Sequence, residues 1–112
     1  MPDKEKFLGE FEQVVLLALL RLGENAYGAL IRQLLHDQIH RDVAIGALYS
    51  TLERLEQKSL VSSALGESTA ERGGRAKRYF KVTAKGQTAL KRAREAMDSM
   101  WSGVSINCMG EL

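Results

Sequence analysis

The chain has few residues of the kinds that interrupt or cross-link a fold. Among its 112 residues, Pro2 is the only proline and Cys108 the only cysteine. A single cysteine excludes a disulfide within the chain and suits a reducing compartment. Because every residue after Pro2 has a backbone N–H to donate, proline interrupts no later helix or strand.

Long apolar runs are also missing. The longest covers residues 14–20, seven in all, whereas a transmembrane helix needs about 18 or more. Residues 3–6 are all charged, unlike the apolar region of a signal peptide. We therefore expect a cytoplasmic protein with no membrane partner.

Acidic residues are absent from one stretch of the chain. Residues 72–94 contain nine Lys or Arg and no Asp or Glu, while the other seven basic and all fourteen acidic residues lie elsewhere. The total charge is only +2, but the rest of the chain carries −7. This polarity predicts a local positive field that attracts a polyanion.

Apolar residues at helical spacing predict helices over residues 7–22, 25–38 and 45–58. The first is apolar around most of its circumference, which indicates a further packing partner such as a second subunit. We expect Gly23 to end it and Asn25 to cap the second helix. The third helix should direct one set of residues inward, namely Ile45, Leu48, Leu52 and Leu55.

After residue 58 the residue pattern changes from that of a helix to that of strands. Residues 60–65 and 78–83 predict a β-hairpin whose loop, 66–77, holds Gly73 and Gly74. Thr83 can cap a last helix over 84–102. Its apolar residues are spaced 3, 4, 3, 4, as in a coiled-coil dimer. We expect the dimer interface to combine this seam with the first helix: Phe7, Phe11, Val14, Leu90, Ala93, Met97, Met100, Trp101 and Val104.

This element order predicts a mainly α fold with a small β-hairpin. We expect a winged helix-turn-helix over residues 1–83, a C-terminal dimerisation helix over 84–104, and a poorly ordered tail over 105–112. Small residues on the outer face of the third helix let its backbone enter a major groove, and basic residues on the hairpin can grip phosphates or enter a minor groove. No row of aromatic residues favours single strands. The predicted contacts to double-stranded DNA are Gly46, Ala47, Ser50, Thr51 and Arg54 on the helix, and Arg72, Gly73, Gly74, Arg75, Lys77 and Arg78 on the wing.

Several segments resemble the PadR family of transcriptional regulators. They include LLALL at 16–20, AYG at 26–28, GALYSTLERLE at 46–56, ERGGRAKRYF at 71–80 and VTAKG at 82–86. The resemblance implies a winged helix-turn-helix, a dimer built by the first and last helices, and transcriptional control, usually repression relieved by a small molecule. It also implies that Tyr27 and Tyr49 contact DNA.

The sequence departs from the family at three helix ends. Ser59 stands where the family usually has glycine, at a cost of about 1 kcal/mol if its backbone is left-handed. Ala44 replaces a serine cap, which leaves Asp42 as the candidate cap of the third helix. Ala84 replaces a proline at the start of the last helix.

Other functions receive less support. No nucleophile–base set or phosphate loop predicts an enzyme, and no motif requires a cofactor. His36 and His40, at i and i+4, leave a metal-responsive regulator open as an alternative. A winged helix used for protein–protein contact is another. Phe11, Met97 and Trp101 are a candidate pocket for a small apolar or aromatic effector.

Overall fold

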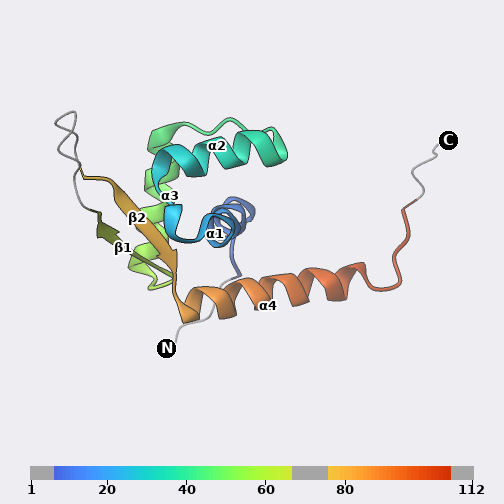
Figure 1. The fold of residues 1–112 in the computed structure, drawn as a ribbon. Coiled ribbons are helices and arrows are strands. Elements are labelled where there is room, and N and C mark those ends of the chain that lie inside the picture. Colours follow the sequence, from blue (N-terminus) through green and yellow to red (C-terminus); the bar gives the residue numbers. More distant parts are fainter. Residues whose placement is uncertain (1–6, 67–75, 107–112) are drawn as a thin grey trace.

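The computed structural model describes residues 7–66 and 76–106, and Figure 1 shows their arrangement. Three helices come first: α1 (Glu10–Leu22), α2 (Gly28–Ile39) and α3 (Ile45–Gln57), with a short 3-10 turn, η1 (Gly23–Asn25), after α1. The strands β1 (Val61–Leu65) and β2 (Arg78–Val82) follow, and α4 (Ala84–Trp101) is the last element. This mainly α fold with one small hairpin confirms the fold class expected from the sequence.

The core lies where the three helices meet the hairpin. Leu16, Ile31, Leu48, Leu52 and Leu55 are completely enclosed there. The strands pair antiparallel, with Val61 opposite Val82 and Leu65 opposite Arg78, so that Phe80 and Val82 face the core. Burial of this apolar surface is the main stabilisation of the fold.

The helix ends follow the sequence in some places and not in others. Gly23 ends α1 with a positive φ of 61°, and the Thr83 hydroxyl caps α4 by accepting a 3.0 Å hydrogen bond from the Gly86 N–H, as expected. The expected cap at Asn25 is wrong, because α2 begins after Tyr27. The N–H of Phe80 donates to the carbonyl of Ala26, which holds this segment against β2 instead of in a helix.

The turn between α2 and α3 also differs from expectation. Ala44 occupies the N-cap of α3 without any side-chain cap, and the Asp42 carboxylate instead contacts the His36 imidazole at 2.6 Å. Asp42 as the cap of α3 is therefore wrong. Ile45 was expected to face inward but is exposed, because it lies in the uncovered first turn of the helix.

Helix α4 runs beneath α1 and extends beyond it (Figure 1). Its first half is attached: Ala89 and Leu90 pack on the core and Ala93 is buried. The radius of gyration is 17.0 Å, whereas a compact domain of this length has about 13 Å. We call the part from Phe7 to Ala93 the body, and residues 94–101 the distal segment.

No helix in the described ranges combines the length and apolar content that crossing a membrane requires.

Candidate nucleic-acid interface

The outer face of α3 is open and lined with small residues. Gly46, Ala47 and Ser50 are exposed, and a Cβ built on Gly46 would meet no atom within 4 Å. The opposite side of the helix carries Leu48, Leu52 and Leu55 in the core. Because the small residues leave the backbone uncovered, the helix can approach the floor of a major groove closely.

Tyr49 connects this helix to its neighbours. Its ring lies 6.0 Å from that of Phe80, centroid to centroid. Its hydroxyl would be only 2.5 Å from a Cβ on Gly28, so glycine at that position leaves room for the Tyr49 ring, which would have to shift for any larger residue. Tyr49 is half-buried and is therefore held in a fixed place at the edge of the outer face.

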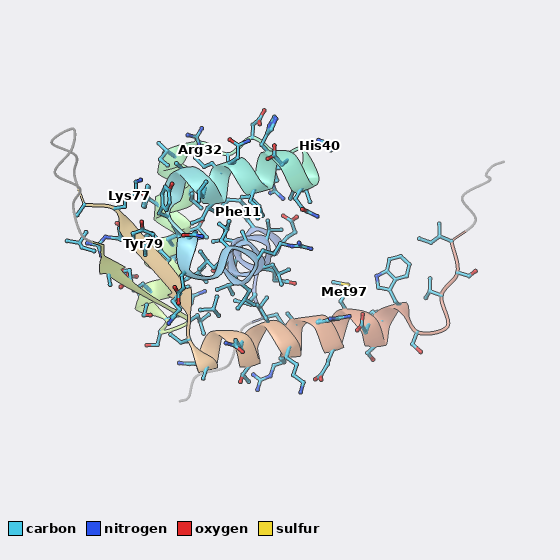
Figure 2. The ribbon with its side chains drawn as sticks, in the orientation of Figure 1. Phe11, Arg32, His40, Lys77, Tyr79 and Met97 are labelled. Atoms are coloured by element: carbon cyan, nitrogen blue, oxygen red, sulfur yellow. The ribbon has the colours of Figure 1, made fainter. Side chains whose placement is uncertain are left out.

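A second aromatic contact attaches the wing to α2. The rings of Tyr27 and Tyr79 meet edge to face, with centroids 5.4 Å apart. The Lys77 ammonium lies 4.5 Å from the centroid of the Tyr27 ring, a cation–π distance. Figure 2 shows Lys77 and Tyr79 together at the base of the wing. Their arrangement directs a positive charge to the same side of the molecule as the start of α2.

A recess of about 780 Å³ separates the start of α2, the outer side of α3 and the hairpin. A chain of hydrogen bonds crosses its wall: Arg78 donates to the Ser63 hydroxyl at 2.9 Å, and that hydroxyl donates to the Glu56 carboxylate at 2.8 Å. These hydrogen bonds link α3 to the hairpin. The recess is lined by Tyr27, Gly28, Ala29, Tyr49, Glu53, Glu56, Leu65, Ala76, Lys77, Arg78 and Phe80.

Two of the residues predicted to contact DNA have partners within the protein. Thr51 is only 3% exposed, so its hydroxyl is enclosed by the protein. The Arg54 guanidinium lies 3.5 Å from the Thr51 hydroxyl and 3.8 Å from the Glu12 carboxylate of α1. The helical period alone placed Arg54 outward. The buried acid, which lies 42 positions earlier in the chain, draws one side of the guanidinium toward α1, while the Arg54 side chain remains 53% exposed.

Glu12 is a buried carboxylate with a complete set of partners. It accepts hydrogen bonds from the Gly9 N–H at 2.9 Å and from the Lys58 ammonium at 3.0 Å. Burial by itself would raise the pKa of Glu12. The two hydrogen bonds and the charges of Lys58 and Arg54 outweigh it, so the pKa lies below the ordinary value of 4.5. Glu12 therefore stays ionised and joins α1 to the end of α3.

The predicted wing-tip residues Arg72, Gly73, Gly74 and Arg75 lie outside the described residues.

Comparison with known proteins decides the family. The sequence profile of the Transcriptional regulator PadR-like family matches residues 16–92. The chain belongs to the PadR-like family. It is accordingly a transcriptional regulator and a winged-helix DNA-binding protein, and the family is not one of enzymes.

Solved structures agree with this assignment. A PadR-like transcription factor from Bacteroides fragilis is 29% identical, with a TM-score of 0.68 over 82% of this chain and 84% of that one. A PadR-like regulator from Bacillus cereus is 22% identical, with a TM-score of 0.68 over 90% and 93%. A winged-helix DNA-binding protein from STIV shares the fold at 16% identity, with a TM-score of 0.66 over 89% and 100%. Among curated proteins, none matches the chain.

Apolar residues of this PadR-like chain gather on a second surface, away from the outer face of α3. A groove of about 990 Å³ lies between α1 and α4. Leu17 and Leu20 line it from α1 and are about half exposed, as is Met97, which faces them from α4. Neither leucine is among the residues predicted for the dimer interface, although their i, i+3 spacing on a helix that is apolar around most of its circumference is the signal that would have indicated them.

The residues predicted for the dimer interface divide into three sets. Phe11 and Val14 pack against the core of their own chain, and the Arg41 guanidinium covers the Phe11 ring at 5.1 Å. Leu90 and Ala93 attach α4 to the body. The exposed set is Phe7, which precedes α1, with Met97, Met100, Trp101 and Val104. Figure 2 shows Phe11 and Met97 on separate elements, and Phe11 does not line the groove that Met97 lines.

The two histidines lie at the end of α2 in different surroundings. His40 ends α2 with a left-handed backbone, φ 55°, and the His36 imidazole is engaged by Asp42. The hydrogen bond to Asp42 and its charge raise the pKa of His36 above 6.5. Residues 7–66 and 76–106 contain no group of three metal-ligating side chains.

Proposed function

We propose that this regulator is a homodimeric repressor that binds a pseudo-palindromic operator and is released by a small apolar or aromatic effector. The observation that carries the proposal is the apolar groove between α1 and α4, which continues onto the exposed distal segment.

The exposed apolar side chains of the distal segment favour contact with a second copy of the chain. Met100 is 75% exposed and Trp101 50% exposed, and the burial of such side chains contributes about 1.5–3 kcal/mol each. Met97 and Met100 continue the side of α4 on which Leu90 and Ala93 pack. A two-fold arrangement of α1 and α4 would cover the seam in both copies at once.

Sedimentation tests the dimer. At micromolar concentration we expect a species of about twice 12.4 kDa. Met97→Lys should shift it toward the monomer because it places a charge in an apolar contact. Ser99→Lys adds the same charge to an exposed residue that does not line the groove, and it should leave the dimer intact. A wild-type monomer would contradict the proposal.

A two-fold dimer prefers half-sites about 10 bp apart, one helical turn of DNA. In this arrangement α3 enters the major groove, and Tyr27, Tyr49, Lys77 and Arg78 lie along the phosphates beside it. The wing tip would reach the neighbouring minor groove. Repression follows if the occupied operator overlaps a promoter.

Salt dependence tests the phosphate contacts. Lys77→Ala should reduce the slope of log affinity against log salt by about 1. Lys81→Ala removes the same charge from a lysine that lines a different hollow of the hairpin, beside Gly23 and Glu24, and should change the slope less. A shallow slope for the wild-type protein would instead favour a protein–protein interaction module.

The effector would occupy the apolar groove where Met97 meets Leu17, with Trp101 one turn further along α4. Phe11 packs against the core of its own chain. The proposed pocket therefore includes Met97 and Trp101 but not Phe11. Binding alters DNA affinity only if the effector prefers one spacing of the two wings. A panel of planar aromatic compounds should quench Trp101 emission and weaken operator binding together, and Trp101→Ala should abolish the second effect. Quenching without loss of DNA binding would contradict release by the effector.

A further inference from the structure

We infer that Glu53 determines operator specificity, by accepting a hydrogen bond from the N4 amino group of a cytosine in the major groove. This inference rests on the proposed operator binding through α3. The base that α3 selects would be a cytosine, and Glu53 is not among the contacts predicted from the sequence.

The position of Glu53 places it on the outer face of α3. Gly46, Ser50 and Glu53 are related by i, i+4 and i+7, which puts them on one side of a helix. All three are exposed, and Leu48, Leu52 and Leu55 are buried behind them. The two residues before Glu53 on this ridge are small, so the carboxylate is the first long side chain along it.

Apart from Gln57, which ends α3, the other long polar side chains of the helix are already engaged within the protein. The hydroxyl of Tyr49 packs against Gly28, and Arg54 is directed to Glu12. Glu56 accepts from Ser63 at 2.8 Å. Glu53, in contrast, has neither a hydrogen bond nor an ion pair with any residue in the ranges 7–66 and 76–106. Its carboxylate is therefore available to an external donor.

Electrostatics restricts what that donor can be. A carboxylate brought against DNA meets phosphate repulsion and loses water, which is unfavourable unless a donor replaces the water. On the major-groove edges, the amino groups of cytosine and adenine are the hydrogen-bond donors. The adenine amino group lies beside the N7 acceptor, which repels a carboxylate, so cytosine is the better match.

Selection from a pool of random DNA duplexes tests the assignment. The wild-type protein should enrich a site with a cytosine at one position of each half-site. Glu53→Gln should change the preferred base there to adenine, since glutamine pairs with both the N6 and N7 groups. In binding assays, the ratio of affinities for the two sites should change on the order of fivefold or more.

Glu56→Gln is the matched control. It removes the same charge from the same helix, and glutamine can still accept from Ser63. It should raise affinity for many sequences without changing the preferred base. Thermal unfolding followed by circular dichroism checks that both variants are folded.

The outcomes separate this inference from the function on which it rests. If the wild-type protein enriches a site but Glu53→Gln keeps the same preference at every position, Glu53 does not read a base and the inference is wrong, while operator binding stands. If the wild-type protein enriches no sequence at all, operator recognition fails and the inference fails with it.

Discussion

The body and the distal segment of this PadR-like regulator treat apolar residues in opposite ways. In the body, Leu16, Leu48 and Leu52 are fully enclosed. Along α4, burial ends abruptly after Ala93, and Met97, Met100 and Trp101 are exposed. The difference shows that contacts within one chain bury the apolar residues of the winged helix but leave those at the end of α4 exposed.

The largest expected effect separates the two regions directly. Leu52→Ala leaves a cavity in the core and should lower the free energy of unfolding by about 2–5 kcal/mol. Met100→Ala should change the free energy of unfolding of the monomer by less than about 0.5 kcal/mol, while raising the dissociation constant of the proposed dimer. Chemical denaturation at low concentration and sedimentation at high concentration measure the two quantities. A large loss of monomer stability in Met100→Ala would contradict the contrast between the body and the distal segment.

A buried charge is the next test of the body. Glu12→Gln should destabilise it by roughly 1–3 kcal/mol at neutral pH, because Lys58 and Arg54 lose their partner. The pKa of Glu12 is lowered in the folded state. Its contribution is therefore present above the unfolded value of 4.5 and is lost as the pH falls through the folded value.

Urea denaturation of both proteins at pH 7 and at about pH 3 measures this dependence. The stability gap between wild type and Glu12→Gln should shrink in acid. Glu10→Gln, which alters an exposed pair with Arg41, is the control and should show little gap at either pH. An equal gap at both pH values would mean that packing, and not charge, explains the loss.

Relief of a strained backbone position should increase the stability of the body by a smaller amount. Ser59, which joins α3 to β1, has a φ of +66°, where glycine is favoured by about 1 kcal/mol. Ser59→Gly should stabilise the body by up to that amount, without any change in the proposed dimer. Ser62→Gly, placed in an ordinary strand, should destabilise it instead. Thermal unfolding of the pair provides the comparison, and equal shifts would contradict the argument.

The smallest effect concerns His36, at the surface of the helix-turn-helix. Its raised pKa means that the contribution of its contact with Asp42 is present below about 6.5 and is lost as the pH rises through the folded value. In an NMR titration, Asp42→Asn should lower the pKa of His36 more than Asp37→Asn, since Asp37 acts through charge alone. Equal shifts would show that the hydrogen bond is unimportant.

Local patterns in the sequence determined much of this protein. Helical spacing, the strand-like run at 78–83 and the Thr83 cap identified every long element to within a few residues, because side-chain period and capping act over one or two turns. The same patterns identified the small-residue face of α3 and the family. The predicted contacts to DNA and across the dimer remain predictions.

Tertiary structure decided which side chains are buried or paired within the chain and which are free to contact other molecules. Thr51 is buried, Arg54 is turned toward Glu12, and Asp42 contacts His36 instead of capping α3. Phe11 packs on its own chain, whereas Leu17 and Leu20 line the groove. No local pattern contains this information, because each outcome depends on a partner from another element. The period of a helix states which residues share a side, but only the packing of the other elements decides which side is covered.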